Sequence, residues 1–235
     1  MTQSSLHLLP VALSCASINQ MSNEAIEAAK SLNMCVVERA KTARHFLKSI
    51  QHPLPLAQIE VCEIPITDTH IFFKDIISRI LEGQSFGLLS EAGMPCIADP
   101  GHELVKMAHQ KGIPVWPYAG PNSMLMALMA SGFSGQNFQF HGYLPAKKEA
   151  LREQVIKLVT ILKKTGVAQI FMETPYRNKQ VFEILLSHVP GDLELCVASQ
   201  LGNPQQCIYT RPIRDWTEAN SKLHYDLPSV FILGK

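Results

Sequence analysis

Short apolar runs alternate with longer amphipathic segments through the first half of the chain. The runs have the length and composition of buried strands, and they lie at 6–9, 34–37, 59–64 and 86–89. The segments between them carry apolar residues at helical spacing. Strands that alternate with helices of about ten or more residues are typical of a parallel sheet with right-handed crossovers. This half is therefore predicted to be an α/β domain.

Local signals set the predicted ends of these elements. Pro10 ends the first strand, because proline cannot donate to a strand ladder. Asn23 is expected to cap a helix that runs to Leu32, and a second helix is expected at 42–50. A third helix should end at Gly83, and its buried side is predicted to carry Phe72, Ile76, Ile77, Ile80 and Leu81.

The second half begins with the same alternation and then loses it. Helices are predicted at 146–164 and 178–188, and strands around Phe138 and Phe140 and at 168–172, 193–198, 207–210 and 229–233. Little helix separates the last strands, which favours a mixed sheet. The chain is therefore predicted to form two α/β domains, 1–118 with a mainly parallel sheet and 119–235 with a mixed sheet, divided at the Ala119-Gly120-Pro121 turn.

Composition fits two folded domains and narrows the function only slightly. Of the 235 residues, 46% are hydrophobic and 17% charged, so each half of about 100 residues can bury a core. The net charge of +1 argues against an extended basic surface, although a local patch fits within this balance. RNA binding is therefore neither supported nor excluded by charge.

The cysteines and the amino terminus indicate a cytoplasmic protein. The six cysteines are scattered, lack C-x-x-C spacing and mostly have apolar neighbours, so we interpret them as reduced core thiols rather than disulfides or metal ligands. The first residues lack the order of a signal peptide, and no apolar run approaches ~18 residues. A soluble protein without a membrane segment is expected.

Two loops in the first half follow apolar strands and precede helices, at the sheet edge where open α/β folds bind ligands. Ser90-Glu91-Ala92-Gly93 combines small residues with a carboxylate, which suits close backbone approach to a ligand, although a tight turn explains it too. Gly120-Pro121-Asn122-Ser123 opens a helix whose free N–H groups can receive an anion or a ring nitrogen. Dinucleotide and phosphate-loop fingerprints are absent.

Three neighbouring features have ordinary structural explanations. Asp99-Pro100-Gly101 reads as a helix start, with Asp99 as N-cap and Pro100 at the first helical position. The methionines after Ser123 are expected to belong to the core rather than to a ligand site. Glu173-Thr174-Pro175-Tyr176-Arg177 follows the strongest strand of the second half, and the sequence leaves a ligand site and a helix-entry turn equally open.

The ordered series of motifs resembles the tetrapyrrole methylase superfamily of S-adenosylmethionine-dependent methyltransferases. The motifs are Ser-Glu-Ala-Gly-x-Pro, Ala-Asp-Pro-Gly, Gly-Pro-Asn-Ser, Ala130-Ser131-Gly132, Phe140-His141-Gly142-Tyr143-Leu144-Pro145 and Glu173-Thr174-Pro175-Tyr176-Arg177. The chain is most similar to the branch of small-subunit ribosomal RNA cytidine 2′-O-ribose methyltransferases, from about residue 6 to 233. The resemblance implies two α/β domains, S-adenosylmethionine bent in the cleft between them, and a homodimer.

The resemblance also implies a set of cofactor-binding residues. The family positions correspond to Pro10, Ser90, Glu91, Ala92, Gly93, Gly120, Asn122, Ser123, Glu173 and Gly202. The loops after the first two strands differ from the ribosomal RNA enzymes, since Val11-Ala12-Leu13-Ser14 replaces a Pro-x-Gly-Asn loop and Glu38-Arg39-Ala40-Lys41 replaces Glu-Asp-Thr-Arg. This chain is therefore interpreted as a divergent relative whose methyl acceptor is open.

The implied reaction is in-line methyl transfer from the sulfonium to an oxygen or nitrogen, with no metal required. A ribose hydroxyl as acceptor would need a base or a cation, for which the candidates are Glu38, Arg39, Arg44 and Arg177. RNA contacts are expected from Lys147, Lys148 and Arg152 and from Arg39, Lys41 and Arg44, although a solvated helix face explains the first three equally well. The rival hypotheses are a tetrapyrrole or other small-molecule methyltransferase, a non-catalytic S-adenosylmethionine-binding protein and a structural protein.

Overall fold

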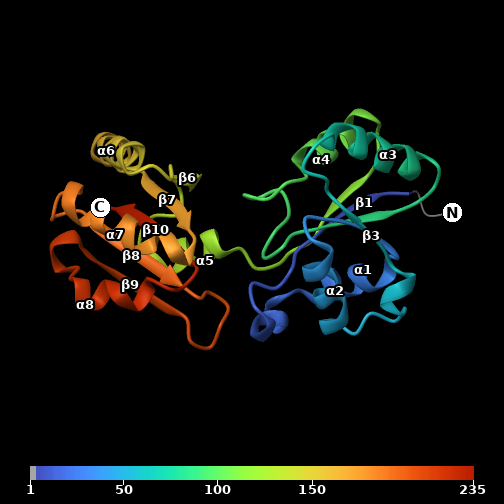
Figure 1. Cartoon of the computed structure of the whole chain (residues 1–235), viewed down its shortest axis with the longest axis horizontal. Helices are drawn as coiled ribbons and strands as arrows, with labels where there is room; N and C mark the ends of the chain where they lie inside the picture. The colour runs from blue at the N-terminus through green and yellow to red at the C-terminus, as the bar shows by residue number, and fades with distance from the viewer. Residues whose placement is uncertain (1–3) are drawn as a thin grey trace. The chain divides into compact units, whose positions relative to one another are not determined.

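The structure is a computed structural model that describes residues 4–235, apart from the side chains of Cys15, Ala16 and Leu223. It folds as two compact units, Met1–Asn122 and Ser123–Lys235 (Figure 1). The units are called unit 1 and unit 2 below. They divide between residues 122 and 123, whereas the sequence analysis places the domain boundary between 118 and 119.

Unit 1 is a five-stranded sheet covered by helices on both faces. The strands are β1 Leu6–Leu9, β2 Met34–Val37, β3 Glu60–Glu63, β4 Phe86–Leu89 and β5 Val115–Pro117. They lie in the order β3-β2-β4-β1-β5, and each neighbouring pair is parallel. The parallel sheet predicted from the alternation of strands and helices is therefore confirmed.

The sheet divides the core of unit 1 into two layers, and helices cover each layer (Figure 1). The helices are α1 Asn23–Ser31, α2 Ala40–Ser49, α3 Thr69–Leu81 and α4 His102–Gln110, with 3-10 turns η1 Cys15–Gln20 and η2 Leu56–Gln58. Val37 packs in the cluster of α1 and α2, whereas the preceding Val36 packs in that of α3 and α4. Successive strand residues thus supply opposite layers, as strand geometry requires.

Two predicted details of these helices are wrong. The N-cap of α1 is Ser22, whose hydroxyl accepts from the Ala25 N–H at 3.1 Å, and Asn23 is already the first helical residue. The buried side of α3 is Phe73, Ile76, Ile77 and Ile80, while Phe72 is half-buried and Leu81 is 57% exposed. Counted from Phe73, the buried residues follow at three, four and seven positions and form one stripe, whereas Phe72 and Leu81 lie at its two sides.

Unit 2 is built on a mixed sheet, as the run of strands without helices predicts. Its elements are α5 Ser123–Ser131, β6 Phe138–Tyr143, α6 Lys148–Thr165, β7 Ala168–Glu173, α7 Pro175–His188, β8 Glu194–Ser199, β9 Cys207–Pro212, η3 Ile213–Asp215, α8 Glu218–Ser221, η4 Lys222–His224 and β10 Ser229–Gly234. The strand order is β6-β7-β10-β8-β9. Only the β6–β7 pair is parallel among these neighbours.

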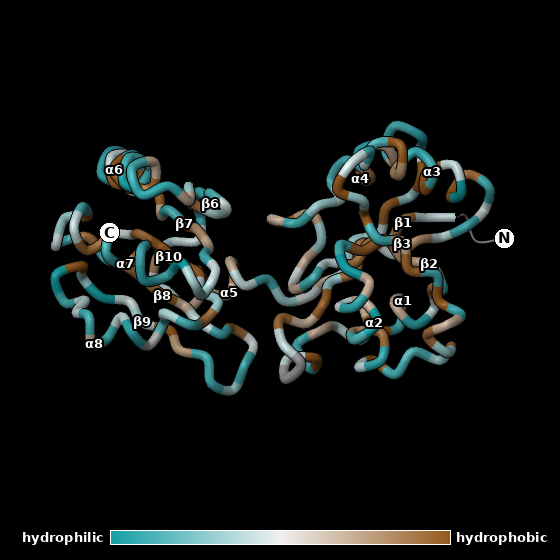
Figure 2. Tube along the Cα trace, viewed as in Figure 1, coloured by the Kyte–Doolittle hydropathy of each residue, from teal (hydrophilic) through white to brown (hydrophobic). Residues whose placement is uncertain are grey.

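Aromatic rings form the centre of the unit 2 core. Phe171 of β7 stacks on Phe231 of β10 with ring centroids 5.3 Å apart, and Phe182 of α7 meets Phe231 edge-on at 5.3 Å. Such pairs contribute about 0.5–1.5 kcal/mol beyond their buried area. In Figure 2, hydrophobic and hydrophilic residues alternate along the trace of α6. The helix therefore turns an apolar stripe to this core, with Leu151, Val155, Leu158 and Leu162 fully buried.

The expectation that the methionines of α5 belong to the core is wrong. The buried residues of α5 are Ala127, Leu128 and Ser131, whereas Met124 and Met126 are half-buried and Met129 is 82% exposed. The helix is apolar on nearly all sides, so its sequence does not mark which side is covered.

The five cysteines with described side chains are free. Cys35 and Cys196 are buried as expected, but Cys62, Cys96 and Cys207 are only half-buried. Burial raises the pKa of the Cys35 thiol to about 12, so it stays protonated at neutral pH. Within residues 4–235, no three His, Cys, Asp or Glu side chains gather as a metal site, and no described helix has the length and apolarity to span a bilayer.

Candidate functional site

The order of strands in unit 1 places a topological switch point between β1 and β4. The chain leaves β1 toward β2 on one side, and it leaves β4 toward β5 on the other. Open α/β sheets bind ligands at the carboxyl ends of strands at such a switch point. The loops concerned begin at Pro10 and Ser90, both of which the sequence analysis selects.

Backbone contacts join the loops after β1 and β4. Val11 N–H donates to the Gly93 carbonyl at 2.8 Å, and Gly93 N–H donates to the Val11 carbonyl at 2.8 Å. Gly93 has a φ of +89°, a conformation that side chains rarely adopt. A Cβ there would lie 3.4 Å from Leu13 Cδ2 and 3.5 Å from the Pro121 carbonyl oxygen. The loop after β5 therefore reaches the same place.

Gly120 is fixed by its contact with Pro10. A Cβ on Gly120 would lie 2.3 Å from Pro10 Cβ and 2.4 Å from Pro10 Cγ, which is far inside any ordinary contact. Two residues further on, Asn122 is almost fully buried and its amide nitrogen lies 3.8 Å from Met94 Sδ. The structure thus brings together Pro10, Gly93, Gly120 and Asn122 from three loops.

Asp99 does not cap a helix, which corrects the sequence analysis. The N-cap of α4 is Gly101, with a φ of +117°, and its cap has no side-chain hydrogen bond. The turn instead directs Asp99 back toward β4, where the Ser90 hydroxyl donates a hydrogen bond to Asp99 Oδ2. Ser90 Oγ in turn accepts from the Ala92 N–H at 3.2 Å. Asp99 therefore belongs to the loop that follows β4, and the local sequence pattern does not indicate its contact with Ser90.

The charges of three carboxylates, Glu38, Glu91 and Asp99, act on one another in the loops after β2 and β4. Partial burial raises the pKa of Glu38, and the negative charges of Glu91 and Asp99 raise it further. Burial also raises the pKa of Asp99, against hydrogen bonds from the Ser90 hydroxyl and the Glu91 backbone that lower it. Arg39 lies at this end too, with Nε 3.7 Å from Glu91 Oε2 and a side chain that is 69% exposed.

Glu91 has one oxygen in an unusual position. Glu91 Oε1 is buried and has no hydrogen-bond partner among the described residues. A buried carboxylate oxygen without a donor is costly, and it suits a site that receives a donor from a ligand. Ala92, in contrast, is exposed.

Arg44 is exposed on α2, and its positive charge acts to lower the pKa of Cys35 of β2. Of the catalytic candidates in unit 1, the structure therefore groups Glu38 with Arg39.

Glu173 and Arg177 form a buried pair in unit 2. Arg177 Nη2 lies 3.0 Å from Glu173 Oε1, and it also donates to the carbonyls of Leu144 at 3.0 Å and Pro145 at 2.8 Å. Burial raises the pKa of Glu173, while Arg177 acts to lower it. The guanidinium is thus held by three oxygens and fastens the segment after β6 to the start of α7.

The remaining predicted residues also lie in unit 2. Ser229 of β10 pairs with both Glu173 and Ser199, so the ends of β7 and β8 lie level at one edge of the sheet. Gly202 follows β8 there, with a φ of +81° that favours glycine and an N–H that donates to Gln206 Oε1 at 3.4 Å. Ser123 is the first residue of α5. Glu173 and Gly202 therefore share an edge within their unit.

Below this edge lies a buried polar network that the sequence analysis misses. His224 is fully buried, and its Nδ1 is 2.6 Å from Ser199 Oγ. The amide of Asn178, also fully buried, donates to the carbonyls of His224 at 2.6 Å and Leu227 at 2.7 Å. Burial, together with the nearby charge of Arg211, lowers the pKa of His224 to about 4. His224 is therefore neutral at physiological pH, and the network holds the segment before β10 in place.

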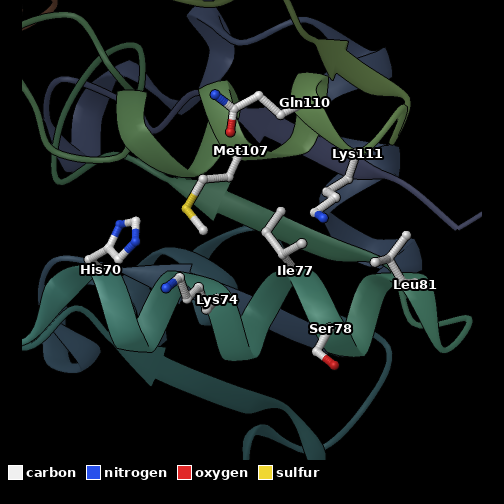
Figure 3. Close-up of a pocket in the computed structure, with 8 residues that line it drawn as sticks. All are labelled: His70, Lys74, Ile77, Ser78, Leu81, Met107, Gln110 and Lys111. Carbon is white, nitrogen blue, oxygen red and sulfur yellow. The ribbon is translucent and has the colours of Figure 1, made fainter.

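A separate cavity of about 460 Å³ lies between α3 and α4 (Figure 3). Ile77 from α3 and Met107 from α4 point into it, and Lys74 and Lys111 lie at its sides. None of the site residues predicted from the sequence lines it.

Solved structures with the same architecture are methyltransferases. The crystal structure of the methyltransferase CobJ aligns with a TM-score of 0.64 at 18% identity, covering 99% of this chain and 94% of CobJ. That of the cobalt precorrin-4 methyltransferase CbiF aligns with a TM-score of 0.63 at 13% identity, covering 98% and 94%. The predicted fold class, two α/β domains of the tetrapyrrole methylase type, is confirmed.

The chain belongs to the family Tetrapyrrole (Corrin/Porphyrin) Methylases, which matches residues 15–216. It is similar to the protein of Vibrio cholerae named "Ribosomal RNA small subunit methyltransferase I", at 28% identity over 89% of this chain and 69% of that protein. Its identity to the Bacillus subtilis protein of that name is 30%, over 83% and 63%. To the Halalkalibacterium halodurans protein of that name it is 41%, over 48% and 38%.

The family match confirms the predicted membership of the tetrapyrrole methylase family, and these relatives carry the name of a ribosomal RNA methyltransferase. The matches span 38% to 69% of the lengths of the three relatives.

Proposed function

We propose that the protein transfers a methyl group from S-adenosylmethionine to RNA, as an enzyme related to small-subunit ribosomal RNA methyltransferases. The observation that carries the proposal is the convergence of the loops after β1, β4 and β5 at the switch point, where Gly93 contacts Val11 and Gly120 contacts Pro10. Membership of a methylase family and relatives named for ribosomal RNA support it.

The residues present fit the cofactor. Pro10 leaves no room for a side chain at Gly120, the positive φ of Gly93 disfavours one there, and Glu91 Oε1 is a buried acceptor that lacks a donor among the described residues. We assign Pro10, Ser90, Glu91, Ala92, Gly93, Gly120 and Asn122 of unit 1 to this function, with Ser123, Glu173 and Gly202 of unit 2. Backbone groups and the Glu91 carboxylate would recognise the polar parts of the cofactor by hydrogen bonds.

Bound S-adenosylmethionine supplies an electrophilic methyl group on a sulfonium that is already a good leaving group. The chain must then hold the acceptor in line and take its proton. Glu38 is our candidate base for a ribose hydroxyl, because partial burial and the charges of Glu91 and Asp99 raise its pKa. A carboxylate with a raised pKa holds a proton better at neutral pH. Arg39 and Arg44 remain candidates for contacts with the acceptor, whereas the bonds of Arg177 favour a structural role.

RNA contacts are assigned to exposed cations. Lys147, Lys148 and Arg152 are exposed around the start of α6, and Arg39, Lys41 and Arg44 are exposed around α2. Their contribution would weaken with salt, since each phosphate contact releases counterions. The proposal includes a homodimer in the cytoplasm, which would double each basic patch; light scattering of the purified protein tests the dimer.

Two experiments test the proposal. Calorimetry with S-adenosylmethionine is expected to show one site per chain. The purified protein is then incubated with the cofactor and 30S subunits, free ribosomal RNA or tRNA, and the product is mapped by mass spectrometry. If the protein binds S-adenosylmethionine but methylates none of these RNAs, the hypothesis of an RNA substrate is refuted and a cofactor-binding protein is left. If it does not bind S-adenosylmethionine, the methyltransferase hypothesis itself is refuted.

The role of Glu38 has its own comparison. Glu38→Gln is expected to keep cofactor affinity within about threefold while methylation falls by about 10²-fold or more, the usual contribution of a general base. The matched control is Glu27→Gln, which removes an exposed carboxylate of α1 that pairs only with Lys30 at 3.0 Å among the described residues. Equal rates for Glu38→Gln and the control would rule out Glu38 as the base.

A further inference from the structure

The loop between β4 and α4 holds an unusual backbone. Cys96 and Ala98 have φ values of 65° and 60°, and Gly101 has a φ of 117°. The left-handed region is disfavoured for residues other than Gly, Asn and Asp. Two such residues within three positions persist only where other contacts hold the loop.

The contacts that hold this loop converge on Asp99. Its carboxylate accepts from the Ser90 hydroxyl and from the backbone of Glu91, while Ser90 Oγ accepts from the Ala92 N–H. Ser90 is 6% exposed, so its hydroxyl exchanges little with water. A carboxylate that accepts hydrogen bonds in a half-buried place makes stronger bonds than a neutral acceptor. Asp99 therefore holds Ser90 and Glu91 directly, and Ala92 through Ser90 Oγ.

Packing fixes the far end of the turn. A Cβ on Gly101 would lie 2.6 Å from Leu88 Cδ2, so the turn lies directly against β4. Gly101 allows the chain to pass there, and it, rather than Asp99, is the cap residue of α4. The Asp99 side chain is thereby free of the capping role that its sequence context suggests.

We propose that Asp99 is a positioning residue for the cofactor loop, which it holds through Ser90 and the Glu91 backbone so that Ser90–Gly93 is preformed before ligand binds. This inference rests on the proposed function, because that function assigns the loop to S-adenosylmethionine. Preforming a loop raises affinity by removing the entropy cost of ordering it on binding. A loop that is tied at residues 90 and 91 and bridged to Val11 at Gly93 is fixed at both ends.

The test compares Asp99→Ala, Asp99→Asn, Ser90→Ala and the Ser90→Ala/Asp99→Ala double variant. Calorimetry gives the dissociation constant for S-adenosylmethionine, and amide hydrogen exchange of the peptide covering residues 90–99 reports the order of the loop. Asp75→Ala is the matched control, since it removes an exposed carboxylate on α3.

Asp99→Ala and Ser90→Ala are each expected to weaken cofactor binding by about tenfold and to speed exchange in the loop, in keeping with lost hydrogen bonds to a charged group. The double variant should bind about as weakly as Asp99→Ala, because Asp99→Ala already removes the Ser90–Asp99 hydrogen bond. Asp99→Asn keeps an acceptor for Ser90 and should recover affinity to within about threefold of wild type. The control should match wild type in both measurements.

Three results would overturn the proposal: wild-type affinity and exchange in Asp99→Ala, multiplied losses in the double variant, or an equal loss in Asp99→Asn and Asp99→Ala. Failure of the proposed function is distinguishable, because wild-type protein would then bind no S-adenosylmethionine. Hydrogen exchange alone decides in that case: faster loop exchange in Asp99→Ala with recovery in Asp99→Asn supports the positioning role, and unchanged exchange refutes it.

Discussion

Replacement of Gly120 by alanine tests the packing of the candidate site most directly. The new methyl group would lie 2.3 Å from Pro10 Cβ and 2.4 Å from Pro10 Cγ, whereas ordinary contacts begin at 3.4 Å. The proline ring cannot rotate away as a flexible side chain can. Its position is fixed by β1 on one side and by the Val11–Gly93 bridge on the other. The clash must therefore push apart the loops after β1 and β5.

The expected cost follows from this geometry. Overpacking of this kind destabilises a protein by about 1–3 kcal/mol. We expect Gly120→Ala to lower the free energy of unfolding by about that amount in urea titrations, and to weaken S-adenosylmethionine binding by about tenfold or more in calorimetry. Gly135→Ala is the matched control, because its Cβ would meet only Leu128 Cδ2, at 3.9 Å.

A compensating change makes the prediction specific. Pro10→Gly removes both atoms that the new Cβ would strike, so the Gly120→Ala substitution should cost much less in a Pro10→Gly background than in the wild type. The reasoning is refuted if Gly120→Ala unfolds and binds like the Gly135→Ala control. It is also refuted if the cost of Gly120→Ala is the same in both backgrounds.

Further predictions concern pH and two ion pairs. The pKa of His224 is about 4 in the folded protein and about 6.5 in the unfolded chain, so the unfolded chain takes up its proton first as pH falls. The free energy of unfolding is therefore highest above about pH 6.5 and declines by up to about 3 kcal/mol toward pH 4. Urea titrations should show this decline in wild type and a shallower one in His224→Asn, and equal slopes would contradict it. Glu173→Gln leaves the Arg177 guanidinium without its carboxylate partner and should lower the free energy of unfolding by about 3–5 kcal/mol. The double variant Glu173→Gln/Arg177→Met should recover part of that stability. The pairing would be disproved if the single variant were no less stable than the double variant. Arg79→Lys removes the two guanidinium hydrogen bonds to Glu60, at 2.8 and 2.6 Å. Because Glu60 is half exposed, thermal melts should show a loss of stability of at most about 1 kcal/mol. A larger loss would show that the pair is better shielded from water than its exposure indicates.

The sequence predicts the layers of this fold well, because period and length carry that information locally. Strand β2 occupies 34–37 as predicted, and the shift from alternating helices to successive strands correctly predicts a mixed second sheet. Features that depend on which elements pack together in space are harder to predict from the sequence. The side of α5 that packs was missed since the helix is apolar on nearly every side, and Met129 is left 82% exposed.

The candidate site shows the same division. Gly93 and Gly120 could be selected from sequence because glycine after a buried strand signals close backbone approach. Their partners, Val11 and Pro10, lie in a loop distant in sequence, and only the order of strands brings them together. Asp99 was misread because Asp-Pro-Gly before a helix has a sufficient local explanation, while its contact with Ser90 depends on two left-handed residues that the sequence does not mark.

The position of β10 has a consequence for how the chain acquires its structure. β10 follows every other strand of its sheet in sequence, yet it lies at the centre, paired with β7 and β8. During synthesis, β7 and β8 therefore lack the strand that lies between them until residues 229–234 have been made. In unit 1 the last strand, β5, joins at an edge. Since domains tend to fold as units in the order of synthesis, unit 1 can assemble while the ribosome is still translating, whereas the exposed edges of β7 and β8 need protection until residues 229–234 have been made.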